Sequence, residues 1–458
     1  MLIYQNQKER SMRILAILIL ILTLSCSNHL VADEAVEDKF VQAITTGQYE
    51  LAESYYSPEL AEALQKGKLE FVWNGIIRNT GKFEVVVESE RTEREDFYSV
   101  VTTLKFENVY MDMVMSVNND DKLSGLFFRP SEYTGDLEQI PAYGDEAKYI
   151  EEEVEFDCQG YTIYGSLIVP KDQRSFPIVI MATGSGPNDR DEKIGANKPF
   201  KNIAQGLGSL GVATLRYDKR TLTHGAEIAK MPEFDIDNEY TQEVDSAIDF
   251  LSKKYKGRNI YFLGHSMGAF MAPRILKENP ELQAAVMLAA NARPTEDLVL
   301  EQTEYIMVET DDVNPVKLAM VEKAVADVKK IKNMKSEVEE PLLLGVSKAY
   351  WLSLNKYDQL KEAKSIKEPV LVLQGERDYQ VTMEDFNIWK DNFEKAQNWH
   401  FQSYPNLNHL FMTGQGKSLP QEYMKPGVVA EEVIADIARF ILNIENNQRN
   451  NSGGGMRK

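Results

Sequence analysis

The strongest constraint on the fold is an alternation of short apolar runs with helical segments from Tyr149 onward. Two strands are expected first, at Tyr149–Cys158 and Tyr161–Pro170, joined by a turn. Five short apolar runs follow: Ile178–Thr183, Val212–Tyr217, Ile260–Leu263, Ala285–Ala289 and Val370–Leu373. Between them lie amphipathic segments such as Tyr240–Tyr255. Strands that alternate with helices pair in parallel and are covered on both faces, so the sequence predicts a doubly wound, mostly parallel α/β domain over residues 149–446.

Residues 33–130 show a different order, with helices first and strands second. Helices are expected at 35–44, 51–56 and 60–77. Four strands are then expected at Lys82–Arg91, Phe97–Phe106, Val109–Val117 and Leu123–Arg129. This pattern predicts a small α+β domain, with helices on one face of a curved antiparallel sheet, followed by a linker at 131–148. The domain contains no His and no Cys, which favours a scaffold over a ligand-binding role.

The composition is that of a globular protein and argues against nucleic acid as a partner. The 458 residues are 43% hydrophobic, which is enough for two or three domains with cores of their own. The 51 Lys and Arg residues against 71 Asp and Glu give a net charge of −20. No basic run that could neutralise phosphates occurs in the predicted domains.

The first 25 residues resemble a bacterial lipoprotein signal. A short apolar run, Ile14–Leu24, follows basic residues and leads into Thr23-Leu24-Ser25-Cys26. The run is too short to span a membrane, although an ordinary signal or a buried helix remains an alternative. The resemblance implies cleavage before Cys26, acylation of that residue, and an exported protein held on a membrane of the cell envelope. Cys158 then has no partner and is expected to be buried, and the tail 447–458 is expected to be disordered.

The pentapeptide Gly264-His265-Ser266-Met267-Gly268 carries the chemistry. It follows an apolar strand and opens a helix through Phe270 and Leu276. A nucleophile between a buried strand and a helix needs a sharp turn, and glycines on both sides relieve crowding there. This context predicts that Ser266 is an exposed nucleophile, with Gly264, His265 and Gly268 completing the elbow.

A serine hydroxyl needs a base to take its proton and an acid to orient that base. The candidates are Asp378, beyond the strand that starts at Val370, and His409, beyond an expected strand at Trp399–Tyr404. Position in the chain disfavours the other four histidines: His29, His224, His265 and His400. Asp378 is preferred to two other acids, Glu376 and Asp385, because it lies several residues past its strand. The order Ser, Asp, His is typical of this fold.

Two backbone amides are expected to form an oxyanion hole. One belongs to Met267, the residue after the nucleophile, and the other to Ser185, in a glycine-containing loop after the first parallel strand. Within that loop, the run Asn188–Glu192 lacks the oxygens and the glycine of a calcium loop, so a charged, solvated loop is expected. No metal-ligand spacing and no phosphate-binding loop follow any strand, so neither metal nor cofactor is expected.

Together these motifs resemble the α/β-hydrolase superfamily of serine hydrolases. With Arg216-Tyr217-Asp218-Lys219-Arg220 and Thr183-Gly184-Ser185-Gly186-Pro187, the chain is similar to the EstD-type carboxylesterases, which also carry a small uncharacterised N-terminal domain. The resemblance implies hydrolysis of small esters with short acyl groups through an acyl-enzyme, with Ser266, Asp378 and His409 as the triad. Thr221 departs from the pattern, because such proteins often have glycine there.

Residues 292–366 are too many for a simple crossover and predict a helical cap. Helices are expected within it at 315–331 and 341–354. A serine aminopeptidase or amidase remains an alternative function, because the same triad cleaves amides. The cap offers acids for a substrate ammonium group: Glu301, Glu304, Glu309, Asp311 and Asp312. A binding protein without catalysis is a third reading, which the intact Ser, Asp and His positions oppose.

Overall fold

The computed structural model describes residues 35–171, 175–311, 314–332 and 342–453, without the side chains of 451–453. The predicted signal, His29, Cys26, Asp312 and the end of the tail lie outside these residues. The described residues divide into two compact units, of which the first contains most of residues 35–129. No helix in the described ranges is long and apolar enough to cross a membrane.

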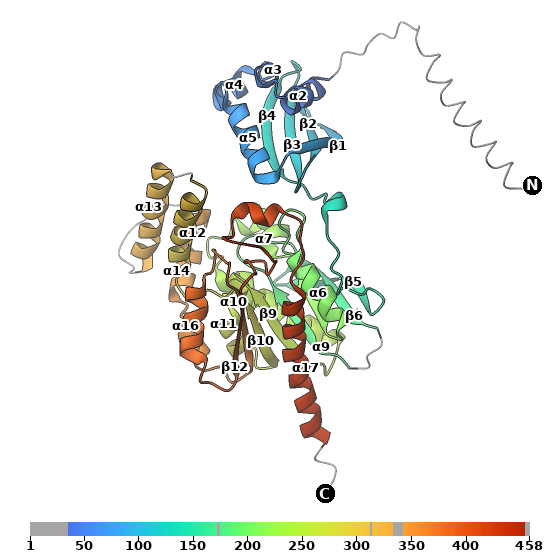
Figure 1. Ribbon diagram of the computed structural model, residues 1–458, viewed down its shortest axis with the longest axis vertical. Helices are drawn as coiled ribbons and strands as arrows, with labels where there is room; N and C mark the ends of the chain where they lie inside the picture. Colours follow the sequence, from blue (N-terminus) through green and yellow to red (C-terminus); the bar gives the residue numbers. More distant parts are fainter. Residues whose placement is uncertain (1–34, 172–174, 312–313, 333–341, 454–458) are drawn as a thin grey trace, which may run out of the picture. The chain divides into compact units, whose positions relative to one another are not determined.

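The first unit has the α+β order that the sequence predicts (Figure 1). Its helices are α2 (Val36–Thr45), α3 (Tyr49–Glu53), α4 (Pro58–Leu64) and α5 (Lys68–Thr80). An antiparallel sheet follows in the order β1 (Phe83–Glu93), β2 (Phe97–Phe106), β3 (Tyr110–Asn118) and β4 (Leu123–Pro130). The expected helix 60–77 is two helices, because Gln65 and Gly67 adopt φ of 54° and 82°. These left-handed conformations interrupt the helical hydrogen bonds between α4 and α5.

The second unit is built on an eight-stranded mixed sheet in the order β12-β11-β10-β9-β7-β8-β6-β5. The strands are β5 (Tyr149–Cys158), β6 (Tyr161–Pro170), β7 (Ile178–Ala182), β8 (Ala213–Tyr217), β9 (Ile260–His265), β10 (Leu282–Leu288), β11 (Val370–Gly375) and β12 (Trp399–Tyr404). The six strands from β8 to β12 in this order are parallel, and β6 is antiparallel to both of its neighbours. The carboxyl ends of the parallel strands therefore share one edge of the sheet.

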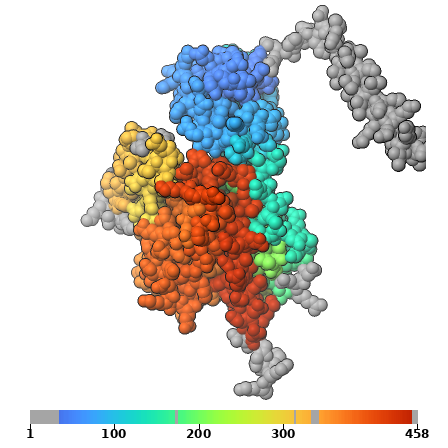
Figure 2. Space-filling model, in the orientation of Figure 1, coloured from blue at the N-terminus to red at the C-terminus, as the bar shows by residue number. Residues whose placement is uncertain are grey.

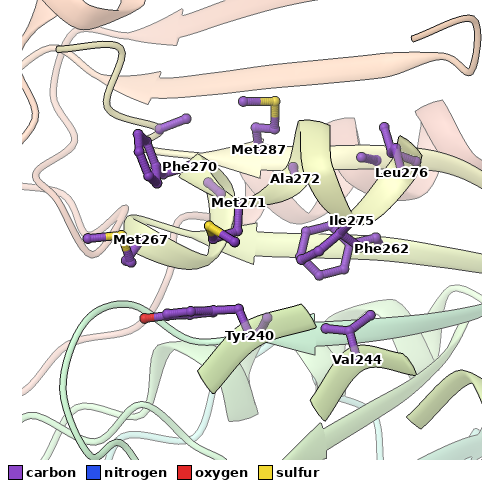
Figure 3. Packing of buried hydrophobic residues seen from close by; sticks show 14 of the residues in the cluster. Tyr240, Val244, Phe262, Met267, Phe270, Met271, Ala272, Ile275, Leu276 and Met287 are labelled. Carbon is purple, nitrogen blue, oxygen red and sulfur yellow. The ribbon is translucent and has the colours of Figure 1, made fainter. Parts of the chain in front are cut away.

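Helices cover both faces of this sheet. Successive side chains along a strand point to opposite faces, so a strand that is apolar throughout needs cover on both. In β7, Ile178 and Ile180 pack in one apolar cluster, while Val179 and Met181 pack in another on the opposite face. The first face is covered by α9 (Gln242–Lys254), α10 (Met267–Phe270), α11 (Ala272–Glu278) and α16 (Met383–Phe393), and the second by α6 (Pro199–Ser209) and α17 (Glu431–Gly453). Figure 3 shows part of the first cluster, including the Tyr240 ring.

Tyr240 belongs to a short π-helix, η2 (Asp237–Thr241), which precedes α9. Two very short helices, α7 (Arg220–Thr223) and α8 (Gly225–Ile228), follow β8.

The long segment between β10 and β11 is helical. It contains α12 (Thr295–Glu309), α13 (Pro315–Lys332), a 3₁₀ turn η3 (Leu343–Gly345), α14 (Lys348–Lys356) and α15 (Gln359–Ala363). Helices α12 and α13 form the yellow lobe of Figure 2. Helix α12 lies within the predicted helical cap but outside the two stretches named for it, and the second of these begins only at Lys348, where the Ser347 hydroxyl accepts a hydrogen bond from the Tyr350 N–H.

The last helix, α17, continues to Gly453 and so covers part of the tail expected to be disordered. The side chains of Glu445 and Gln448 accept hydrogen bonds from Asn259 at 2.7 and 2.8 Å. Gln448 also donates to Gln283 at 2.8 Å. These contacts hold the helix on the sheet beyond residue 446, and a polar composition alone does not reveal them.

Candidate active site

Ser266 stands on a sharp turn between β9 and α10. Its backbone has φ 52° and ψ −115°, a conformation that is strained for a residue with a side chain. The Ser266 N–H donates to the carbonyl of Leu288 in the neighbouring strand at 2.8 Å, and its carbonyl accepts from the Phe270 N–H at 2.9 Å. Within the described part of the chain the Ser266 hydroxyl makes no hydrogen bond. The turn thus presents a half-buried hydroxyl at the carboxyl edge of the sheet.

The two glycines of the pentapeptide are required by close backbone approaches. A Cβ on Gly264 would lie 2.4 Å from the carbonyl carbon and oxygen of Gly268. A Cβ on Gly268 would lie 2.3 Å from the carbonyl oxygen of Ala182. Since backbone atoms cannot move aside as side chains can, any larger residue at either position would displace the turn that carries Ser266.

Asp378 and His409 are joined by a short hydrogen bond. Nδ1 of His409 lies 2.6 Å from Oδ2 of Asp378, and both side chains are buried. The other carboxylate oxygen of Asp378 accepts from the N–H groups of Gln380 and Val381 at 2.8 and 3.0 Å. Gln374 also donates to Oδ2, at 3.1 Å. Because Asp378 accepts from Nδ1–H, the proton of neutral His409 is on Nδ1 and the lone pair of Nε2 is free.

The histidines and acids that sequence reasoning set aside have other partners. His224 contacts the carbonyl of Thr162 at 2.9 Å, and His400 is exposed on β12. Glu376 is exposed and accepts from Ser403. Asp385 is fully buried, but it binds the backbone N–H groups of residues 292 and 293 and the Arg293 guanidinium. It therefore holds the start of the helical insertion.

The loop after β7 lies against Ser266. A Cβ on Gly184 would lie 3.2 Å from Cβ and 3.7 Å from Oγ of Ser266. The Gly184 N–H donates to Glu192 at 2.6 Å, so this amide has a partner within the loop. Ser185 follows and is exposed. On the other side of Ser266, the Met267 N–H begins helix α10 and, like every first N–H of a helix, has no partner inside it.

The charged run 188–192 is not the solvated loop that was expected. Arg190 pairs with Asp218 at 2.8 Å, and Asp191 pairs with the buried guanidinium of Arg216. Glu192 is 5% exposed. The run is ordered by ion pairs to the strands beside it, which only the fold brings within reach. No group of three or more His, Cys, Asp or Glu side chains in the described residues is arranged to hold a metal ion.

Sequence reasoning missed two roles. It gave Glu192 none, and it placed His265 in the elbow without its contacts to other loops. Oε1 of Glu192 lies 2.9 Å from Nδ1 of His265, and Nε2 of His265 lies 2.9 Å from the backbone carbonyl of His409. This chain of contacts ties the loop after β7, the elbow and the His409 loop together. Burial acts to lower the pKa of His265, but the Glu192 carboxylate and these hydrogen bonds outweigh it, so the pKa is raised.

Comparisons with known proteins place relatives along most of the chain. The family profile described as serine aminopeptidase, S33 matches residues 197–416, and that of a protein of unknown function, DUF3887, matches residues 38–126. Esterase EstD of Thermotoga maritima is 32% identical over 404 residues, which cover 88% of this chain and 94% of that protein.

Two solved esterase structures are similar to part of this chain. Est1E from Butyrivibrio proteoclasticus is 16% identical, covering 64% of this chain and 99% of its own, with a TM-score of 0.43. The Pyrococcus furiosus esterase Pf2001 is 18% identical, covering 57% of this chain and 84% of its own, with a TM-score of 0.39.

Proposed function

Because this chain belongs to the family of esterase EstD and is a carboxylesterase of the α/β-hydrolase fold, we propose that it cleaves short-acyl esters through an acyl-enzyme on Ser266. Its substrate is a small-molecule ester. His409 is the general base and acid, and Asp378 orients it. The short acyl group follows from the resemblance of the motifs to EstD-type carboxylesterases.

The proposed reaction has two halves. The Ser266 oxygen attacks the ester carbonyl while Nε2 of His409 takes the hydroxyl proton. The imidazolium returns that proton to the departing alkoxide, so an alcohol leaves and the acyl group stays on Ser266. Water then attacks the acyl-enzyme, again giving its proton to His409. The proton finally returns to Ser266 as the carboxylic acid is released.

Charge that develops on the carbonyl oxygen needs donors that are already in place. Met267 follows Ser266 in the chain, and Ser185 follows Gly184, whose Cβ position lies 3.2 Å from Cβ of Ser266; neither N–H has to break an intrahelical bond to turn toward an oxyanion. We assign the oxyanion hole to these two amides. Gly184 is excluded, because Glu192 already holds its N–H at 2.6 Å.

The observation that carries the proposal is the 2.6 Å contact between His409 Nδ1 and Asp378, at the sheet edge where Ser266 stands. It fixes the tautomer in which the second ring nitrogen can act as a base. Hydrolysis of p-nitrophenyl acetate, butyrate and octanoate tests it. We expect turnover that falls with acyl length and is lost in Ser266→Ala. Undiminished turnover in that variant would overturn the mechanism, and a preference for octanoate would overturn the short-acyl part.

The family profile named for a serine aminopeptidase keeps peptide cleavage as the second candidate. An aminopeptidase needs unpaired acids to bind the substrate ammonium group. Glu301 pairs with Arg293 at 2.7 Å and Glu309 pairs with Lys417, while Glu304 and Asp311 are exposed. Two of these acids are therefore already paired, and the preference for ester over peptide cleavage rests on the relationship to esterase EstD. Cleavage of aminoacyl p-nitroanilides at a higher kcat/KM than the best ester would reverse that order.

We also propose that Cys26 carries a lipid anchor that holds the exported protein on a membrane of the cell envelope, on its periplasmic or its surface side. The support is the apolar run followed by Leu24-Ser25-Cys26. Expression of the full chain in a bacterial host with labelled palmitate tests it. We expect labelled palmitate on the wild-type chain in the membrane fraction, and no label on the Cys26→Ala chain. Equal labelling of both chains would overturn the anchor.

A further inference from the structure

A buried lysine lies behind the loop that carries the proposed oxyanion donor. Lys219 follows β8, the strand beside β7, and is 1% exposed. Its Nζ lies 2.8 Å from the carbonyl oxygen of Gly184 and 3.1 Å from that of Gly186. It also lies 2.7 Å from Oε1 of Glu239 and 2.8 Å from the Tyr240 hydroxyl. Nothing in the proposed reaction yet uses this group.

The contacts of Lys219 require a protonated ammonium. Two carbonyls and a carboxylate can only accept hydrogen bonds, and the Tyr240 hydroxyl accepts from the lysine while it donates to Gly184 at 2.9 Å. Burial raises the pKa of Tyr240, which keeps this hydroxyl protonated. In Figure 3 the Tyr240 ring lies in the apolar cluster and its hydroxyl oxygen at the edge. A cation is thus held beneath the loop by an acid and a phenol.

The carbonyl of Gly184 is the focus of this arrangement. It accepts from Lys219, from Tyr240 and, at 3.1 Å, from the Asn188 amide. The same peptide unit carries the N–H of Ser185. In a planar trans peptide the C=O and the N–H point in opposite directions, so three donors on the carbonyl fix where the N–H points. A cation on the carbonyl also draws electron density from the nitrogen and makes that N–H a stronger donor.

We propose that Lys219, with Tyr240, is a positioning residue that aims and polarises the Ser185 N–H toward the substrate oxyanion. The inference rests on the proposed function, because it requires Ser185 to be an oxyanion donor. Lys219 touches no reacting atom and acts through the loop after β7, chiefly through the Gly184–Ser185 peptide. Glu239 holds the ammonium in place and accepts a hydrogen bond from Tyr350 of α14, so the support reaches into the helical insertion.

The test compares Lys219→Met with a matched control, Arg220→Met. Arg220 is 2% exposed and pairs with the fully buried Glu243, so its loss removes a similar buried cation. Its hydrogen bonds go to Asn238, Gln242 and Glu243, and none reaches the loop after β7. The readouts are kcat and KM on p-nitrophenyl butyrate, and inhibition by a trifluoromethyl ketone, which forms a tetrahedral adduct on an active serine.

We expect Lys219→Met to lower kcat about 100-fold, with KM changed less than about threefold. Binding of the trifluoromethyl ketone should weaken by the same factor as kcat/KM falls, because the adduct carries the oxyanion. Arg220→Met should lower thermal stability, but its kcat and its affinity for the trifluoromethyl ketone should stay within about threefold of wild type. Equal losses of kcat in the two variants would overturn the proposal, since Lys219 would then act only through packing.

Tyr240→Phe decides the matter if Lys219→Met does not fold. It removes one hydroxyl and should lower kcat and ketone binding together, by about threefold to tenfold. Unchanged ketone binding in a folded Tyr240→Phe would overturn the proposal. Full turnover by Ser266→Ala would instead overturn the proposed function itself, whatever the Lys219 variants do.

Discussion

Glu192 and His265 form a buried pair in which the carboxylate Oε1 lies 2.9 Å from the imidazole Nδ1. The same oxygen accepts the N–H of Gly184 at 2.6 Å, and the far side of the ring meets the His409 carbonyl. Glu192 itself has φ 52°, outside the range that residues with side chains prefer. The surrounding contacts hold this strained residue in place, which indicates that its carboxylate is needed there.

The pair makes stability depend on pH. The pKa of His265 is raised above its ordinary value of about 6.5, so the folded state binds a proton that the unfolded state releases. The pair's contribution is complete below about pH 6.5 and is lost as the pH rises through the raised pKa. We expect the stability advantage of the wild-type protein over Glu192→Gln to shrink from pH 6 to pH 9 in urea unfolding. The exposed His400→Gln is the control, and a pH-independent difference would contradict the prediction.

Asp378→Asn should abolish most of the activity without unfolding the protein. The amide can still accept from Gln380 and Val381, but it would direct an N–H or a neutral oxygen at His409 and lose the tautomer that exposes Nε2. We expect kcat on p-nitrophenyl butyrate to fall about 10³- to 10⁴-fold. Glu376→Gln, two residues earlier and exposed, should keep kcat within about twofold. Comparable losses in both variants would remove Asp378 from the triad.

Gly268→Ala should damage the elbow itself. The added methyl group would lie 2.3 Å from the carbonyl oxygen of Ala182, so β7 and the start of α10 would have to separate. We expect the free energy of unfolding to fall by about 2 kcal/mol or more, and the esterase activity to be lost as well. Gly225→Ala, where no atom lies within 4 Å of the new Cβ, should change stability by less than about 0.5 kcal/mol. Thermal melting of both variants measures the difference.

Asp385 should prove essential for the helical insertion, although it is not in the triad. Asp385→Ala leaves the N–H groups of residues 292 and 293 and the Arg293 guanidinium without their buried partner. We expect the free energy of unfolding to fall by about 3–5 kcal/mol. Asp391→Ala, on the exposed side of the same helix, is the matched control and should be close to neutral. A wild-type melting temperature for Asp385→Ala would contradict this account.

The strands could be predicted closely because burial shows directly in residue type. The central strands β7 and β9 are buried throughout and differ from their predicted bounds by one or two residues, while β5, β6 and β12 begin and end as predicted. Within the predicted helical cap, the bounds of helix α12 could not be placed because its exposed and buried residues follow no clear stripe. Its polar side chains instead bond to other parts of the fold, as Gln302 does to the Gln380 carbonyl at 2.9 Å.

In the candidate site, too, some residues could be predicted from the sequence and others could not. Ser266, Asp378 and His409 could be proposed because each follows an apolar strand, and parallel strands bring such positions to one edge. Glu192 carries no comparable signal, since it lies in a run of charges whose partners are set by three separate strands. Lys219 did have a signal: it follows β8, which lies beside β7 in the sheet. Without the strand order, that adjacency cannot be read from the chain.

The order of the strands also bears on when this protein can first act. The proposed nucleophile follows β9, but the proposed acid and base follow β11 and β12, which come after the long helical insertion and are the last strands of the sheet in sequence. A chain emerging from the ribosome therefore holds a serine without a base until synthesis is nearly finished. If the proposed triad holds, the hydrolase is inert as a nascent chain, and a chain truncated before β12 has a serine nucleophile but no base to complete the reaction.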